Sequence, residues 1–201
     1  VAVPGGRYLL GAHRSAPFLF DNEKWAHEVV IPPFEIAKAP VTNREFQNFV
    51  DSGGYENATH WDLEGWAWCQ ETGARHPVYW QPHCPGNWLI RRFDKSLPLP
   101  LDEPIIHVNW HEANAYCRWA GLRLPTEAEW EAAALGEVGP DGKLAPVKRR
   151  FPWGNTPPDP CQANLDGRGL GPVDVAALPA GDSAFGCRQM LGNVWEWTAD
   201  T

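Results

Sequence analysis

The sequence contains no apolar run close to the roughly 20 residues that cross a bilayer as a helix. Its first ten residues, VAVPGGRYLL, also lack the basic flank and the apolar stretch of a secretory signal peptide. These absences argue against a membrane-spanning helix and a signal sequence, and we expect a soluble, cytoplasmic protein.

Basic residues are few relative to acidic ones. The 201 residues hold 17 Lys and Arg against 25 Asp and Glu, which gives a net charge of −8 at pH 7. This charge repels the phosphates of nucleic acids, and there is no polybasic patch to attract an anionic membrane. We expect neither a nucleic acid nor a membrane among the partners.

Paired cysteines are also missing. The five cysteines show no C-x-x-C spacing, and their odd number does not predict a disulfide framework. Neither a zinc knuckle nor a set of disulfides can be recognised, so a reducing compartment fits the sequence best.

Glycine, proline and tryptophan are abundant instead. The chain has 19 Gly, 20 Pro and 12 Trp, and its length is enough for one domain with a buried core but marginal for two. Gly and Pro interrupt regular structure, whereas large aromatic rings can still bury much apolar area. The composition predicts one folded, loop-rich domain over residues 1–201.

Three helices are predicted by the same capping box, in which an N-cap side chain bonds the N3 amide and an N3 glutamate bonds back. The boxes begin at Thr42, Asn109 and Thr126, and glycines that can end each helix follow at positions 53, 121 and 136. RYLLGA, HEVVI and FEIAK are predicted strands, the last two as a hairpin through Pro32 and Pro33. The stretch 55–104 stays unassigned.

The last ten residues, GNVWEWTADT, alternate in polarity. Positions 194–197 have period two, so a strand would place Trp195 and Trp197 on one face and Glu196 on the other. We therefore expect the two tryptophans to anchor a core strand, with Glu196 bound to an ion or to backbone amides.

Isolated titratable residues give weaker signals. His107 and His111 are four residues apart, but the N-cap at 109 separates them, so we do not expect this pair to bind a metal. Cys117 lies on the apolar stripe of a predicted helix and is expected in the core. Arg123 is expected to pair with a nearby carboxylate or carbonyl.

The order of the longer motifs resembles a known superfamily. PVTNREFQNFV, HVNWHEANAYCRWAGLRLPTEAEWEAAA, FPWGN and PAGDSAFGCRQMLGNVWEWT follow one another as in formylglycine-generating enzymes (the sulfatase-modifying factors) and the sulfoxide synthases of ergothioneine and ovothiol biosynthesis. FDNEKWAH and PAGDSAFGCRQM are most similar to the ovothiol type, the 5-histidylcysteine synthases, with selenoneine synthases close to them. The resemblance covers essentially the whole chain.

The resemblance implies an α+β protein with an unusual C-type-lectin-like fold of the formylglycine-generating-enzyme type, which has little regular secondary structure. It also implies that residues 1–201 form a single domain of a longer protein. An N-terminal iron-binding helical bundle and a C-terminal end would then lie outside this chain.

The activity implied is that of a non-haem iron sulfoxide synthase, which uses dioxygen to form a carbon–sulfur bond between cysteine, or a related thiol, and a histidine derivative. Such enzymes hold iron(II) through three histidines, mainly from the helical bundle, so the ligands would lie outside this chain. The partners implied are that bundle and the small-molecule thiol and histidine substrates. The domain alone would be inactive, and no catalytic residue can be assigned within it.

Two sets of candidate site residues follow. By composition, aromatic residues between 55 and 88 could stack on imidazole or exclude water, namely Trp66, Trp68, Tyr79 and Trp80. The resemblance implies a structural calcium ion held by Gln189, Gly192, Val194 and Glu196, with Gln189 replacing the usual asparagine. A second calcium site of those enzymes begins at the match to Asn164, but its acidic half is shortened here.

Two other functions stay open. A non-catalytic ligand-binding module could use the same scaffold, because one fold hosts many functions. A formylglycine-generating oxidase is disfavoured by the FDNEKWAH stretch, and by the lack of the cysteine pair that those enzymes use downstream of W-E-W.

Overall fold

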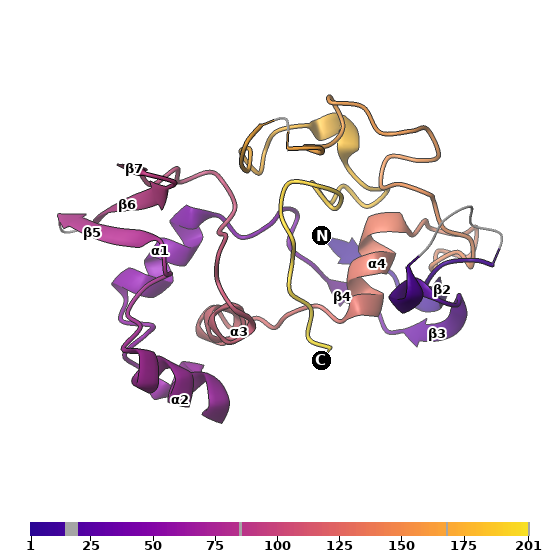
Figure 1. Cartoon of the computed structure of the whole chain (residues 1–201). Helices are drawn as coiled ribbons and strands as arrows, with labels where there is room; N and C mark the ends of the chain where they lie inside the picture. The colour runs from indigo at the N-terminus through magenta and orange to yellow at the C-terminus, as the bar shows by residue number, and fades with distance from the viewer. Residues whose placement is uncertain (15–19, 85, 168, 201) are drawn as a thin grey trace.

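The computed structural model describes residues 1–14, 20–84, 86–167 and 169–200 of the chain (Figure 1). The described strands are β1 (Ala2–Val3), β2 (Gly6–Leu10), β3 (His27–Ile31), β4 (Phe34–Glu35), β5 (Trp80–Cys84), β6 (Asn87–Arg92) and β7 (Lys95–Pro98). The described α-helices are α1 (Asn43–Asp51), α2 (Leu63–Thr72), α3 (Trp110–Trp119) and α4 (Glu127–Leu135). Single 3-10 turns are η1 (Asp21–Glu23), η2 (Ala58–His60) and η3 (Pro179–Gly181). The fold is a mixture of helices and small sheets with few regular elements, as the sequence predicted.

The three predicted helices begin where their capping boxes place them. Thr42, Asn109 and Thr126 are the N-caps of α1, α3 and α4, and each side chain accepts a hydrogen bond from the backbone N–H of the glutamate three residues on. The same glutamates bond back to the N-cap backbone, which satisfies two amide groups that a helix start otherwise leaves unpaired.

Helix α2 lies in the stretch that the sequence left unassigned. Its N-cap Asp62 accepts a bond of 2.7 Å from the backbone N–H of Gly65, and the helix ends at Gly73 with φ of 65°. Gly65 is closely covered by His111 of α3, since a Cβ atom added there would lie 2.8 Å from the His111 Cβ. The glycine therefore lets α2 pack directly on α3.

The predicted hairpin between HEVVI and FEIAK is wrong. Strand β3 pairs antiparallel with β2, with Tyr8 opposite Val29, whereas the short β4 pairs with β1. The Pro32–Pro33 segment therefore leads the chain from one two-stranded sheet to the other. A third sheet has the order β5–β6–β7 and is antiparallel throughout.

Buried apolar residues form two clusters. The aromatic core lies between α1, α2, α3 and the β5–β6 ribbon, and its largest members are Phe46, Phe49, Tyr55, Trp61, Trp80 and Tyr116. The second core lies between α4 and strands β1, β2 and β3, and it includes Val3, Tyr8, Ile31, Leu144, Cys187, Met190 and the alanines at 132–134. In Figure 1 these cores lie on opposite sides of the C-terminal segment.

The C-terminal segment joins the two halves of the fold (Figure 1). The Trp110 indole of α3 donates to Thr198 O at 2.8 Å, and the Trp197 indole donates to Val108 O at 3.0 Å. On the other side, Ala199 N donates to Pro125 O at 2.8 Å, just before α4.

The predicted core strand at 194–197 does not form. The segment is irregular, Trp195 is fully exposed and about half of Trp197 is exposed. Gln189, Gly192 and Asn193 all have positive φ, between 60° and 79°, so the chain turns repeatedly before the tryptophans and cannot pair as a strand.

In the part of the chain that the structure describes, no helix is both long and apolar enough to cross a membrane.

Candidate functional site

A cavity of about 690 Å³ opens beside the C-terminal segment. Three stretches of chain form its walls: the approach to α3, the 164–172 loop and the 193–197 segment. The lining residues are Ile106, His107, Val108, Asn164, Gly167, Gly171, Pro172, Asn193, Val194, Trp195, Glu196 and Trp197. Its size suits a small molecule, and a largely apolar wall with a few polar groups is typical of such sites. We call this cavity the C-terminal pocket.

His107 stands on the first wall of the pocket in an uncommon backbone conformation. Its φ is 60°, which costs energy for a residue with a side chain and persists where the surrounding structure enforces it. Its imidazole meets the Tyr79 ring edge-on, with centroids 4.8 Å apart, and the guanidinium of Arg91 lies over the same ring, 5.3 Å from its centroid. The aromatic region around Tyr79 is thereby connected to the pocket.

Glu196 is an exposed residue whose carboxyl group is nevertheless desolvated. The residue as a whole is exposed, yet burial of the carboxyl end raises the pKa of Glu196 to about 7, and the neighbouring Trp130 side chain opposes part of this rise. Trp130 Nε1 is itself buried and has no hydrogen bond of regular geometry among the described residues. The carboxyl therefore points into the protein, toward the second core, and close to neutral pH it can hold a proton.

Two of the four residues expected to hold calcium, Gln189 and Gly192, already use their oxygens as hydrogen-bond acceptors. The side-chain oxygen of Gln189 accepts a hydrogen bond from Asn193 Nδ2, and Gly192 O accepts from Val194 N at 2.8 Å. Both oxygens therefore face N–H protons. As arranged here, Gln189 and Gly192 do not fit a calcium site. Calcium binding at this position stays a prediction that only a binding measurement can test.

The four aromatic candidates from the 55–88 region lie around the aromatic core, and none of them lines the C-terminal pocket. Trp80 is 2% exposed and belongs to the interior of that core. Trp66, Trp68 and Tyr79 are partly buried against it. Only Tyr79 of the four reaches toward the pocket, through its contact with His107, and a substrate-facing role for the four stays a prediction.

Sequence reasoning missed three polar pocket residues. His107 was considered only as a metal ligand paired with His111, and Asn164 and Asn193 were not proposed as lining residues. Asparagine tolerates left-handed φ, so the G-N pair at 192–193 could have indicated a turn rather than a strand. The positive φ of His107 has no signature in the sequence, because it follows from tertiary contacts alone.

The described part of the chain was expected to contribute no iron ligands. Among residues 1–14, 20–84, 86–167 and 169–200, no three His, Cys, Asp or Glu side chains gather closely enough to bind a metal ion. His107 contacts Tyr79, and His111 lies 3.1 Å from the Asp62 carboxylate, so these two histidines serve different contacts. The prediction that iron(II) is held by a helical bundle outside residues 1–201 stays a prediction.

The fold and its motifs define a family. Residues 1–201 match the family described as the sulfatase-modifying factor enzyme 1-like domain, and the chain belongs to this FGE-sulfatase family. The solved structure of PvdO from Pseudomonas aeruginosa superposes with a TM-score of 0.57 at 24% identity, covering 100% of this chain and 69% of that one. This likeness confirms the fold of the formylglycine-generating-enzyme type.

The individual relatives are named as different members of the family. The chain is 46% identical over 200 residues to the hercynine oxygenase of Mycolicibacterium smegmatis, covering 99% of this chain and 45% of that protein. It is 37% identical over 219 residues to the inactive C-alpha-formylglycine-generating enzyme 2 of Mus musculus, covering 100% of this chain and 68% of that protein. The chain thus spans less than half the length of the hercynine oxygenase that it matches.

Proposed function

We propose that this chain is the family domain of a non-haem iron sulfoxide synthase, which uses dioxygen to join a thiol to a histidine derivative. The observation that carries the proposal is the 46% identity to a hercynine oxygenase over 99% of the chain. That relative favours hercynine, the trimethylammonium derivative of histidine, as the acceptor. The sequence motifs favoured the ovothiol type, whose acceptor is histidine, so the acceptor is the first property to test.

The C-terminal pocket supports a cationic acceptor. Trp195, which is fully exposed, and Trp197, which is about half exposed, both line it with their indole rings. Indole faces attract quaternary ammonium groups through cation–π interactions worth about 0.5–2 kcal/mol. The net charge of −8 favours a cationic ligand over an anionic one. A trimethylammonium group in contact with these tryptophans fits these features.

The overall reaction balances without an external reductant. A C–H bond of the imidazole and the S–H bond of the thiol are replaced by a C–S bond and an S=O bond. Dioxygen accepts four electrons and supplies one oxygen atom to the sulfoxide and the other to water. Iron(II), when bound by the helical bundle, would supply the activation of dioxygen.

The residues of this chain have non-redox tasks in the proposal. The pocket binds and orients the acceptor, and its apolar wall formed by Ile106, Val108 and Val194 excludes water from the ring. Hydrogen bonds from Trp110 and Trp197 hold the wall in place relative to α3. We propose that the helical bundle of the same protein closes the pocket.

The experiment is an oxygen-consumption assay of the full-length protein with ferrous iron, with mass spectrometry of the products. Hercynine and histidine are each paired with cysteine and with γ-glutamylcysteine. The proposal predicts a product with the combined mass of both substrates plus one oxygen atom and minus two hydrogen atoms. Consumption of oxygen with hercynine but not histidine would establish the ergothioneine type, and the reverse would establish the ovothiol type.

A non-catalytic module is the second candidate. It is favoured by the 37% identity to the inactive C-alpha-formylglycine-generating enzyme 2 of Mus musculus. This candidate predicts that hercynine or another cation binds to the full-length protein in calorimetry without oxygen consumption in any pairing. Conversion of a cysteine-containing sulfatase peptide would instead identify a formylglycine-generating oxidase.

A further inference from the structure

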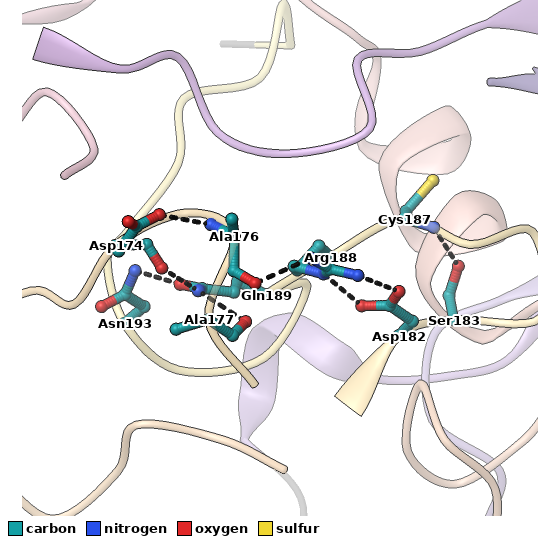
Figure 2. A network of polar contacts seen from close by, with 9 residues as sticks. All are labelled: Asp174, Ala176, Ala177, Asp182, Ser183, Cys187, Arg188, Gln189 and Asn193. Atoms are coloured by element: carbon teal, nitrogen blue, oxygen red, sulfur yellow. Dashed lines mark hydrogen bonds and ion pairs between the residues drawn. The ribbon is translucent and has the colours of Figure 1, made fainter. Parts of the chain in front are cut away.

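A series of hydrogen-bonded side-chain amides, which we call the amide chain, connects the C-terminal segment to residues 164–177 (Figure 2). Gln189 is 5% exposed and lies between the 174–177 turn and Asn193. Its Nε2 donates to Asp174 O at 2.7 Å and to Ala177 O at 3.2 Å. Its Oε1 accepts from Asn193 Nδ2. Each polar atom of this buried amide therefore has a partner.

Asn193 continues the chain toward the 164–172 loop. Its Nδ2 also donates to Val173 O at 3.2 Å, and its Oδ1 accepts from Val173 N at 2.8 Å. The same Oδ1 accepts from Asn164 Nδ2 at 3.1 Å, and that amide donates in addition to Gly171 O at 3.0 Å. Asn164 O accepts from Asn193 N at 3.0 Å. The amide chain thus runs from residue 164 through 193 to 189.

Backbone groups at both ends fix the orientation of these amides. Asp174 O and Ala177 O can only accept, so they require the nitrogen of Gln189. Val173 N–H can only donate, so it requires the oxygen of Asn193. The two conditions agree with a single arrangement, in which Asn193 Nδ2 faces Gln189 Oε1. Reversing either amide would place two acceptors or two donors against each other.

The calcium site expected from the resemblance would use Gln189 Oε1 and Gly192 O, together with oxygens of Val194 and Glu196. Calcium binds six to eight oxygens, usually with several carboxylates among them. Here Gln189 Oε1, Asn193 Oδ1, Gly192 O and Asn164 O each accept a hydrogen bond, so a calcium ion would have to compete with an N–H group at each of them. Glutamine is one methylene longer than asparagine, and this length lets its amide reach the 174–177 turn.

Arg188, next to Gln189, also binds the 174–177 turn. Its guanidinium pairs with both oxygens of the Asp182 carboxylate at 2.8 Å and donates to Ala176 O at 2.8 Å (Figure 2). The consecutive residues Arg188 and Gln189 thus both bind the 174–177 turn. The turn itself is fixed by Asp174, whose Oδ1 accepts from Ala176 N at 2.7 Å.

We infer that the Gln189–Asn193–Asn164 amide chain takes the structural place of a calcium ion in this domain. It holds the wall of the C-terminal pocket formed by residues 193–197 without any metal ion. This inference does not depend on the proposed function, because it concerns how the wall is held rather than what the pocket binds.

The first test compares the full-length protein in calcium and in EDTA, by hydrogen exchange of the peptide covering residues 186–197 and by calorimetric titration with calcium. The inference predicts the same protection of this peptide in both buffers, and no calcium binding that alters its exchange. Loss of protection in EDTA, recovered on adding calcium, would overturn it.

The second test is Gln189→Glu, which removes an N–H₂ donor and sets a carboxylate against two carbonyl oxygens. We expect the 186–197 peptide to exchange about tenfold faster or more, the factor for losing a buried hydrogen bond. The matched control is Gln162→Glu, because the one side-chain hydrogen bond of Gln162 within the described chain is accepted by its oxygen, from Asp159 N at 3.2 Å. Equal exchange in Gln189→Glu and wild type would show that the amide chain does not hold the wall, and would overturn the inference.

Discussion

Arg123 and Glu129 form a two-pronged ion pair at the start of α4. The guanidinium donates to the two carboxylate oxygens at 2.7 and 2.6 Å. The same carboxylate accepts from Thr126 N at 2.8 Å, so it closes the capping box and also ties the preceding loop to the helix. The arginine partner predicted from the sequence is therefore the helix-capping glutamate itself.

Replacing Glu129 by Gln is expected to lower the free energy of unfolding by about 2 kcal/mol at pH 7, because hydrogen bonds to charged groups are stronger than neutral ones. Urea denaturation measures this difference. Glu127→Gln is the control, because Glu127 is exposed in the same turn. An equal loss in both variants would contradict the role of the pair.

The same variant predicts a pH dependence. The hydrogen bond from Arg123 lowers the pKa of Glu129 from its ordinary value of 4.5. A carboxyl with a depressed folded-state pKa stabilises the protein above its unfolded pKa, and this contribution is lost as the pH falls through the folded value. The difference between wild type and Glu129→Gln should therefore be largest near neutral pH and shrink below about pH 4. A difference that grows on acidification would contradict this.

The buried hydroxyl of Tyr55 hydrogen-bonds to Glu112, the glutamate of the α3 capping box. Tyr55 Oη donates to Glu112 Oε1 at 2.6 Å in the aromatic core, and burial raises the pKa of Glu112. Tyr55→Phe leaves this carboxyl short of a partner, and we expect a loss of about 3 kcal/mol in unfolding free energy. Tyr116→Phe is the control, since no hydrogen bond of its hydroxyl is described and its ring stacks on Phe46. Similar losses in the two variants would argue against the pairing.

Substitution of Trp80 tests the prediction that the aromatic residues of the 55–88 region contact the substrate. Because Trp80 is 2% exposed within the aromatic core, Trp80→Ala is expected to cost about 3–5 kcal/mol in stability. If it only packs the core, the KM of folded variant enzyme for the histidine substrate stays unchanged. A KM effect without a stability loss would instead support direct substrate contact.

Substitution of Trp195 tests whether the C-terminal pocket binds the substrate. It is fully exposed in the described chain, so Trp195→Leu should leave the unfolding free energy nearly unchanged. Losing a cation–π contact should raise the KM of the full-length enzyme for hercynine about tenfold. Phe93→Leu, at an exposed position away from the pocket, is the control. An unchanged KM in Trp195→Leu would remove this tryptophan from the proposed binding site.

Local signals in the sequence predicted local structure well. The three capping boxes placed the starts of α1, α3 and α4, because the bonds that define them lie within four residues. Cys117 was expected in the core and is buried there. Helix α2 escaped detection because it contains Gly65 and three aromatic or sulfur side chains without a clear apolar stripe.

Features set by distant contacts were not predictable in this way. The strand pairings depend on which segments meet in space, so the HEVVI and FEIAK strands were joined wrongly as a hairpin. The alternation at 194–197 predicted a strand, but the amide chain through Asn193 and the turn at Gly192 impose a different path. The pocket itself is built from three stretches up to 91 residues apart, from Ile106 to Trp197.

The most direct test of the proposed function is oxygen consumption by the full-length, iron-loaded protein with hercynine and a cysteine-type thiol, with the product identified by mass spectrometry. The account predicts oxygen uptake that requires both substrates and yields a sulfoxide joining them. Absence of uptake with hercynine and with histidine, in a folded protein shown to contain iron, would contradict it.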